Sequence, residues 1–190
     1  MEIKGFLFDM DGTVVDVPYD WKKIKQELHT GGTPILSYIE SLDEPEKSMK
    51  RRRLEEFERT ATLRAEIMPG IPEFLSSLKN RGGKTALVTN NSRKNVDYLL
   101  HKFKLCFDVV LSRECGLWKP SGAPLIAAMK KMNLSPRECC AVGDSWFDIK
   151  AASEAEISRI FILNADRDEF IGSEAEIFSS VAELRKHLGC

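Results

Sequence analysis

Residues 3–13 read IKGFLFDMDGT, an apolar run that ends in two aspartates and a glycine turn. The run from Ile3 to Phe8 lacks a regular alternation of polar and apolar side chains, which predicts a strand buried on both faces of a parallel sheet. Asp9 and Asp11 are two residues apart, so both carboxylates point to the same side at the end of this strand. Two such acids repel each other unless a hard divalent cation or a proton relieves the repulsion.

The rest of the chain alternates between strand-like and helix-like segments. Four further apolar β-type runs, separated by stretches of helical periodicity, lie at residues 85–89, 108–112, 139–143 and 159–163. This alternation predicts an α/β fold, a doubly wound (Rossmann-like) parallel sheet with the strand order 3-2-1-4-5. About 75 residues separate the first strand from the second, so this interval must hold an insertion.

The insertion has the pattern of a small helical unit. Asp20 precedes a polar helix that Gly31-Gly32 would end, and Thr33-Pro34 would cap and begin the next one. We therefore expect an α/β core of residues 1–15 and 68–190 and a small helical cap of residues 16–67. The basic run at residues 50–53 could bind a polyanionic substrate, but such a run visits every face of a helix and is more typical of a solvated surface.

Composition excludes several classes of protein. The 28 basic and 29 acidic residues leave a net charge of -1, which provides no electrostatic drive toward nucleic acid or an anionic membrane. No apolar run approaches the roughly 20 residues of a membrane helix. The five cysteines form no C-x-x-C pair, which argues against a disulfide scaffold or a zinc site. We expect a cytoplasmic protein without nucleic-acid or membrane partners, and its oligomeric state stays open.

A second pair of acids follows the fourth predicted strand. Asp144 ends this strand, and Asp148 lies one helical turn later on the same face. In an open parallel sheet, ligands bind beyond the carboxyl ends of the strands where the winding direction reverses. The first and fourth strands flank that point, so Asp9, Asp11 and Asp144 are expected to converge there.

Other side chains near this edge suit a phosphoryl group. Thr89 and Asn90 end the second predicted strand and begin a helix, where a hydroxyl, an amide and the helix N-terminus can bind an anion. Lys119 can add a point positive charge. An acidic cluster that binds a magnesium-type cation, together with a helix N-terminus and a lysine, suits phosphate better than a carbonyl or a sugar.

These motifs resemble those of the haloacid dehalogenase superfamily: D-x-D-G-T at residues 9–13, then Thr89, Lys119 and G-D-x-x-x-D at residues 143–148. The resemblance covers residues 1–15 and 68–165. The insertion after the first motif is similar to that of the phosphoglycolate phosphatase-like and β-phosphoglucomutase-like branch. Dehalogenases of this superfamily lack the second aspartate and need no metal, so the presence of Asp11 and Asp144 favours a phosphatase.

The resemblance also implies a role for each motif residue. Asp9 would be the nucleophile that forms an aspartyl phosphate, and Asp11 would be the general acid and base. Thr89, with Asn90, would bind the phosphoryl oxygens. Lys119 would neutralise charge on both the nucleophile and the phosphate.

The implied cofactor is Mg²⁺, bound by Asp9, the main-chain carbonyl of Asp11 and Asp144, with Asp148 in support. The resulting hypothesis is a Mg²⁺-dependent phosphatase that hydrolyses a small phosphorylated metabolite. A phosphomutase of the β-phosphoglucomutase type is the alternative, and behind it stands a non-catalytic phosphate-binding protein. A signalling receiver is disfavoured because its accepting aspartate follows the third strand.

Overall fold

The structure is a computed structural model that describes residues 2–164 and 167–190. It divides into two compact units. The first comprises the N-terminal residues up to Asp16 together with Glu66–Cys190, and the second comprises Val17–Ala65.

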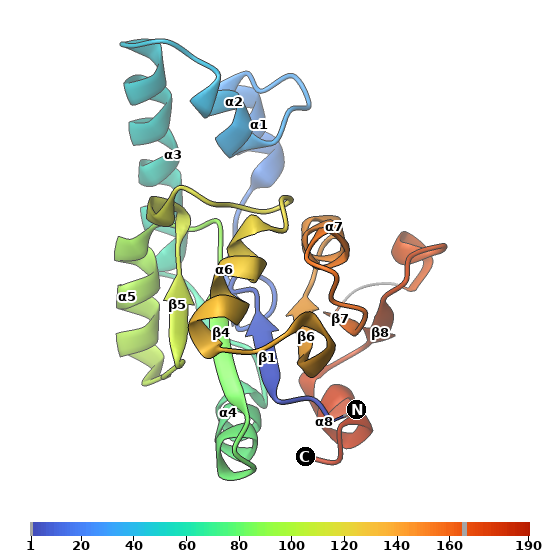
Figure 1. The fold of residues 1–190 in the computed structure, drawn as a ribbon. Coiled ribbons are helices and arrows are strands. Elements are labelled where there is room, and N and C mark those ends of the chain that lie inside the picture. The colour runs from blue at the N-terminus through green and yellow to red at the C-terminus, as the bar shows by residue number, and fades with distance from the viewer. Residues whose placement is uncertain (1, 165–166) are drawn as a thin grey trace. The chain divides into compact units, whose positions relative to one another are not determined.

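A parallel six-stranded sheet forms the centre of the first unit (Figure 1). Its strand order is β5-β4-β1-β6-β7-β8, and every neighbouring pair is parallel. The strands are β1 (Gly5–Phe8), β4 (Lys84–Val88), β5 (Val109–Leu111), β6 (Cys139–Gly143), β7 (Ile160–Leu163) and β8 (Glu176–Phe178). Numbered in chain order these strands read 3-2-1-4-5-6, which confirms the predicted doubly wound α/β fold.

The sixth strand is absent from the sequence prediction. In β8 only Phe178 is buried, while Glu176 is exposed and Ile177 is intermediate. A three-residue edge strand of this kind has too short an apolar pattern to be recognised, and only its pairing with β7 defines it.

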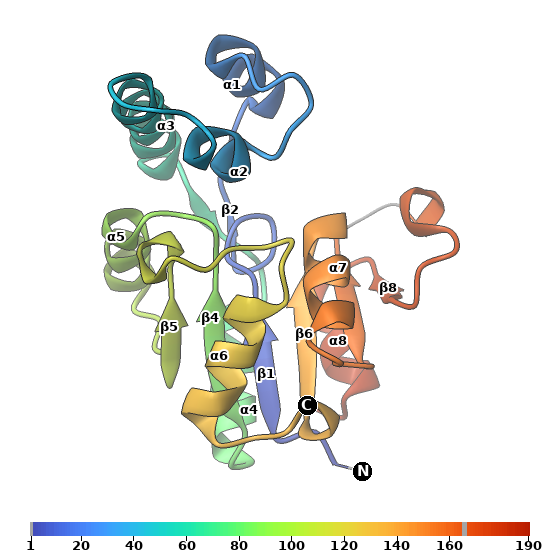
Figure 2. The ribbon, with the colours of Figure 1, turned by 45° about the horizontal axis from the view of Figure 1, so that its top comes forward.

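Helices cover both faces of the sheet (Figure 2). On β1, Leu7 joins a buried cluster with residues of α6 and α7, whereas Phe8 packs edge-on against Phe74 of α4. Neighbouring strand residues point to opposite faces, so α4 lies on the face opposite α6 and α7. The helices of this unit are α4 (Ile71–Asn80), α5 (Arg93–Phe103), α6 (Ala123–Met132), α7 (Trp146–Glu154) and α8 (Val181–His187), with 3₁₀ turns at Arg113–Cys115, Pro136–Glu138 and Arg167–Phe170.

Two short antiparallel strands pair the segment in which the chain leaves the α/β unit with the segment in which it returns. They are β2 (Val15–Asp16) and β3 (Glu66–Ile67), with Val15 opposite Ile67. The chain therefore leaves and re-enters the α/β unit side by side. Two-residue strands leave no periodic signal in the sequence, and this pairing was not predicted.

The second unit contains three helices, α1 (Trp21–Leu28), α2 (Ile35–Glu40) and α3 (Glu46–Thr62). Its core consists of Ile24, Leu28, Ile39 and Leu54. The expected ends of the first two helices are wrong by a few residues. His29, at φ 57°, ends α1 before Gly31, because Leu28 is the last side chain of that helix to enter the core.

The restart of the second helix is also shifted. Pro34 is the N-cap residue, and Ile35 is the first residue of α2. Thr33, the N-cap residue that the sequence predicts, lies one position too early. Proline still precedes the helix, where its missing N–H costs nothing.

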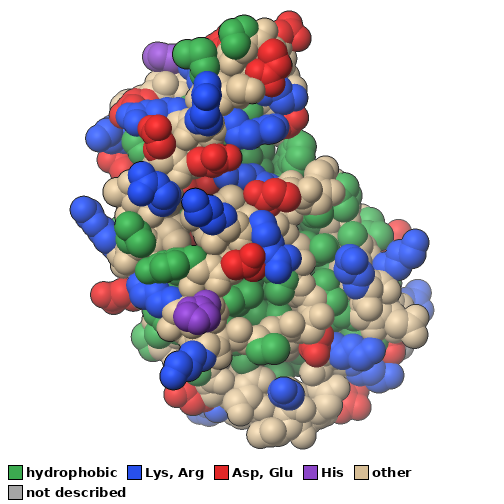
Figure 3. All heavy atoms as spheres, turned by 90° about the vertical axis from the view of Figure 1, so that its left-hand side faces the viewer, with side chains coloured by type: hydrophobic (Ala, Val, Ile, Leu, Met, Phe, Trp, Pro, Cys, Tyr) green, Lys and Arg blue, Asp and Glu red, His purple; other side chains and the backbone are tan. Residues whose placement is uncertain are grey.

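Three residues of the basic run of α3 bind acids or main-chain groups of their own unit. Lys50 Nζ donates to the carbonyl oxygen of Leu28 at 3.0 Å, Arg51 pairs with Glu40, and Arg53 Nη1 lies 2.9 Å from Glu56 Oε2. Basic and acidic side chains are likewise intermingled on the molecular face drawn in Figure 3. These pairs support the interpretation of the run as a solvated helix surface.

Within the residues that the structure describes, none of the helices combines the length and the apolar character that crossing a membrane requires.

Candidate active site

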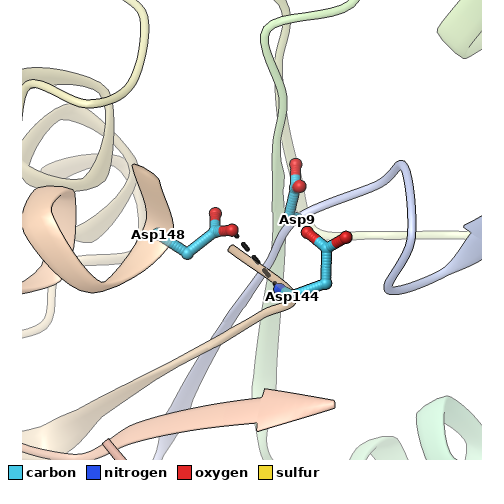
Figure 4. A group of neighbouring side chains, drawn as sticks. All are labelled: Asp9, Asp144 and Asp148. Carbon is cyan, nitrogen blue, oxygen red and sulfur yellow. Dashed lines mark hydrogen bonds between the residues drawn. The ribbon is translucent and has the colours of Figure 1, made fainter. Parts of the chain in front are cut away.

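The candidate site lies at the carboxyl edge of the sheet, where β1 and β6 end. Asp9 directly follows β1, and its N–H donates to the carbonyl oxygen of Val142 in β6 at 2.8 Å. Asp144 follows β6, and Asp148 lies in the first turn of α7. Figure 4 shows the three carboxylates converging from these elements. The winding direction reverses between β1 and β6, so the predicted switch point and the acids coincide.

Two glycines allow the acids to approach each other. Gly12 has a φ of +83°, and a Cβ on this residue would lie 2.0 Å from Asp144 Oδ2. A Cβ on Gly143 would lie 2.3 Å from Asp148 Cγ. Both distances are far below van der Waals contact, so the spacing of the carboxylates depends on the missing side chains. The glycines of the D-G and G-D motifs are therefore part of the site.

Lys119 lies between two of the acids. Its Nζ is 2.6 Å from Asp9 Oδ1 and 2.6 Å from Asp148 Oδ1, and only 4% of the residue is exposed. Burial by itself would lower the pKa of Lys119, but the negative charges of Asp148 and Asp9 outweigh burial and raise it above its ordinary value. The lysine is therefore a permanently charged, buried cation in contact with the predicted nucleophile.

Asp148 uses both carboxylate oxygens within the protein. Oδ1 accepts from Lys119, while Oδ2 accepts from the Ser145 hydroxyl at 2.6 Å and from the N–H groups of Ser145 and Asp144 at 3.1 and 3.3 Å. The contacts with Ser145 form a capping box at the start of α7. These bonds show Asp148 holding Lys119 and the turn that carries Asp144.

The charge balance of the cluster fits a divalent cation. Burial raises the pKa of Asp9 to about 6 against the opposing effect of Lys119. Burial, followed by the nearby charges of Asp9 and Asp148, raises the pKa of Asp144 to about 8. One oxygen from each of the three acids lies within 4.8 Å of the others. Such a set of hard oxygen donors, short of positive charge, is the kind of site that Mg²⁺ or Ca²⁺ occupies.

The segment after β4 contacts both Lys119 and Asp11. Asn90 exchanges two hydrogen bonds with the main chain of Lys119: its Nδ2 donates to the carbonyl oxygen and its Oδ1 accepts from the N–H, both at 2.8 Å. Thr89 Oγ1 accepts from the N–H of Asn91 at 3.0 Å. The Asn90 side chain, predicted to bind phosphate, thus holds the Lys119 main chain in this structure.

Asp11 does not belong to the group of three acids that could share one ion. Among the described residues, that group comprises Asp9, Asp144 and Asp148. Both Asp11 carboxylate oxygens instead accept from Asn91 Nδ2, at 3.0 Å for Oδ2 and 3.3 Å for Oδ1. Asn91 was not among the predicted site residues, although it lies in the same polar segment as Thr89 and Asn90.

Comparison with known proteins identifies the family. The family model of haloacid dehalogenase-like hydrolases matches residues 3–156. The chain belongs to this family. Among its haloacid dehalogenase-like relatives, a hydrolase domain-containing protein of Arabidopsis thaliana is 31% identical over 160 residues, covering 77% of this chain and 64% of that protein. An uncharacterized hydrolase of Saccharomyces cerevisiae is 28% identical over 202 residues, covering 98% of this chain and 92% of the yeast protein.

Other haloacid dehalogenase-like relatives carry phosphatase names. The phosphoglycolate phosphatase of Nitrosospira multiformis is 30% identical over 183 residues, covering 82% of this chain and 81% of that enzyme. A hydrolase structure from Pseudomonas syringae has the same fold, with a TM-score of 0.81, 20% identity and coverage of 98% of both chains. These findings confirm the predicted phosphoglycolate phosphatase-like branch of the family, and with it the prediction of a phosphatase enzyme.

The structure gathers most of the haloacid dehalogenase-like motif residues at one place. Lys119 contacts both Asp9 and Asp148, and Asp144 belongs to the same acidic group as these two acids. Thr89 follows β4, the neighbour of β1 in the sheet. Sequence spacing identified these residues, but it did not reveal which of their polar atoms bind each other.

Proposed function

We propose that this haloacid dehalogenase-like hydrolase is a Mg²⁺-dependent phosphatase that hydrolyses small phosphomonoesters through a phosphorylated Asp9. The observation that carries the proposal is the contact of Lys119 Nζ with Asp9 Oδ1 at 2.6 Å, beside the carboxylates of Asp144 and Asp148. A buried carboxylate next to a fixed cation and a cation-binding acidic group is suited to attack an anionic phosphoryl group.

Asp9, Asp144 and the main-chain carbonyl of Asp11 would hold the metal. Asp148 would support the metal site indirectly, by holding Lys119 and the turn that carries Asp144, because its oxygens already bind Lys119 and the main chain of residues 144–145. When bound, Mg²⁺ supplies positive charge that draws in the phosphoryl oxygens and offsets the charge that develops on them.

The chain's own residues would carry the two transfer steps. Lys119 binds Oδ1 of Asp9, so the attack on phosphorus is assigned to Oδ2. The bond from phosphorus to the ester oxygen breaks, and Asp11 donates its proton to the departing alkoxide. Asp11, now a carboxylate, removes a proton from a water molecule that attacks the phosphorus of phospho-Asp9, which releases phosphate and restores both acids.

Thr89 is proposed to donate its hydroxyl to a phosphoryl oxygen, since its Oγ1 accepts from Asn91 and keeps its own proton for donation. Asn90 would act in phosphate binding through its hold on Lys119. Small phosphorylated metabolites are the proposed partners. The five cysteines are free, in keeping with a reducing compartment, and we propose a cytoplasmic location.

Phosphate release tests this proposal. The substrates are p-nitrophenyl phosphate and a panel of small esters that includes phosphoglycolate and N-acetylmuramic acid 6-phosphate, which the names of relatives suggest. Wild type should release phosphate with Mg²⁺ and not with EDTA. Asp9→Asn should be folded by circular dichroism and inactive on every ester. Activity of this variant near the wild-type rate would refute the phospho-Asp9 mechanism, and a wild type inactive on the whole panel would favour the mutase or the binding protein.

A further inference from the structure

The Asp11 carboxylate is anchored by a buried amide on the neighbouring loop. Asn91, which is 3% exposed, donates Nδ2 to Asp11 Oδ2 at 3.0 Å and to Oδ1 at 3.3 Å. The two residues are far apart in sequence and meet because β1 and β4 are adjacent in the sheet. A buried hydrogen bond to a carboxylate restrains its rotation.

The orientation of the Asn91 amide is determined by its other partners. Its Oδ1 accepts from the N–H of Ser92 at 2.7 Å and from Nδ2 of Asn95 at 2.9 Å. Rotating the amide by half a turn would place its NH₂ group against two donors and its oxygen against a carboxylate. Asn91 therefore presents a donor to Asp11 in a geometry that the surrounding bonds enforce.

Asn95 connects this arrangement to helix α5. It is the third residue of the helix, it is 6% exposed, and its own N–H donates to the N-cap hydroxyl of Ser92 at 3.3 Å. The position of Asn91 is thus defined by the helix start rather than by a flexible loop. The chain of contacts runs from α5 through two amides to Asp11.

Without the hydrogen bonds from Asn91, the Asp11 carboxylate could adopt another orientation. Asp11 is two residues from Asp9, and its charge is near enough to Asp144 to raise the pKa of that acid, so its carboxylate could turn toward the cation site. A carboxylate bound to a cation holds a proton less well, because the positive charge stabilises its ionised form, so it is a poor acid and base. We propose that Asn91 is a positioning residue that keeps the Asp11 carboxylate off the metal and directed at the leaving oxygen.

This proposal rests on the proposed function, in which Asp11 protonates the leaving group. It predicts that the need for Asn91 depends on the leaving group: a weakly basic phenolate departs without a proton, and a more basic one requires it. The readout is therefore the slope of log kcat/KM against leaving-group pKa, measured on substituted phenyl phosphates from p-nitrophenyl to p-methoxyphenyl phosphate. Overall loss of folded protein lowers all substrates equally and leaves this slope unchanged.

Two variants remove the donor. Asn91→Asp retains acceptors for Ser92 and Asn95 and replaces attraction to Asp11 with repulsion, and Asn91→Ala removes the donor without adding charge. Since a general acid is worth about 10²- to 10⁴-fold, we expect kcat/KM to fall by about 10-fold or less for p-nitrophenyl phosphate and about 10²-fold or more for p-methoxyphenyl phosphate. Ser180→Ala is the control. It removes the hydrogen bond that the Ser180 hydroxyl accepts from the N–H of Glu183 at the start of α8, the counterpart of the Ser92–Asn95 bond at the start of α5. This variant should keep the wild-type slope.

Each outcome decides between the hypotheses. A steeper slope in both Asn91 variants supports the positioning role. A wild-type slope, or an equal loss on all esters in the folded variants, overturns it and assigns Asn91 to the fold or to phosphate binding. Failure of the proposed function is seen separately, as absence of Mg²⁺-dependent hydrolysis by wild type or retained activity of Asp9→Asn.

Discussion

Lys119 Nζ contacts Oδ1 of Asp9 at 2.6 Å, and this contact couples the stability of the protein to its chemistry. The same ammonium contacts Asp148 at 2.6 Å, so one buried cation compensates two carboxylates. Since a third acid, Asp144, lies in the same group, the site without metal keeps an excess of negative charge.

Replacing Lys119 with methionine should destabilise the metal-free protein and abolish activity. The methionine fills a similar volume but leaves Asp9 and Asp148 without their shared cation, and removing one partner of a buried ion pair costs about 3–5 kcal/mol. Urea unfolding measures this change. Lys4→Met is the matched control, because Lys4 pairs with Glu138 at 2.9 Å on the surface and its loss should change the midpoint little. Similar midpoints for the two variants would contradict the prediction.

The metal-free protein should lose stability as the pH rises from 6 to 8. The pKa of Asp144 is raised to about 8, so over this range the native state binds more protons than the unfolded state, and the free energy of unfolding falls with pH. Asp9, with a pKa raised to about 6, contributes at the lower end. Asp144→Asn should remove the decline above pH 7 and leave the smaller part that Asp9 contributes near pH 6, as measured by urea unfolding in EDTA. An undiminished decline above pH 7 in this variant would show that other groups cause it.

Bound magnesium should counteract this loss of stability with rising pH. A ligand that binds only the native state stabilises it, and the stabilisation grows as the acids that bind it lose their protons. We expect the shift in melting temperature caused by saturating Mg²⁺ to be larger at pH 8 than at pH 6. Thermal unfolding monitored by circular dichroism measures the shift. An equal shift at both values would indicate binding elsewhere on the chain.

Asp148→Asn should weaken Mg²⁺ binding less than Asp144→Asn. The oxygens of Asp148 already bind Lys119 and the start of α7, so its loss should act on the metal indirectly and weaken binding by about 10- to 100-fold. Loss of Asp144, a direct ligand, should weaken binding by more than about 100-fold. Isothermal titration calorimetry measures both affinities. Equal losses would show that Asp148 is itself a ligand.

Gly12→Ala should damage the site more than a comparable substitution elsewhere. Its φ of +83° strains any side chain, and the new Cβ would lie 2.0 Å from Asp144 Oδ2. Gly116→Ala is the control, since Gly116 has a φ of +76° and a Cβ there would meet nothing within 4 Å. The control should lose about 1–2 kcal/mol of stability from backbone strain alone, whereas Gly12→Ala should lose more and also bind Mg²⁺ more weakly. Equal effects of the two substitutions on unfolding and Mg²⁺ titration would exclude the steric explanation.

The sheet and its winding could be predicted because each central strand carries an unbroken apolar run. The run ending at Phe8 and the one ending at Gly143 are buried on both faces, so local composition identifies them directly. The ends of the helices in the second unit could not be predicted as well. His29 ends α1 in a left-handed conformation although two glycines follow nearby, because packing of Leu28 in the core outweighs the local preference.

The sequence by itself determined the doubly wound fold, the family and the set of chemical groups at the carboxyl edge, since a parallel sheet brings the ends of its strands together wherever the connecting helices run. Only the tertiary structure decided how these groups share their hydrogen bonds. Asp148 accepts from Lys119 and from the start of α7, Asn90 binds the Lys119 main chain, and Asn91 donates to Asp11. These contacts join residues far apart in the chain, and sequence spacing carries no information about which polar atom will meet which once both are buried.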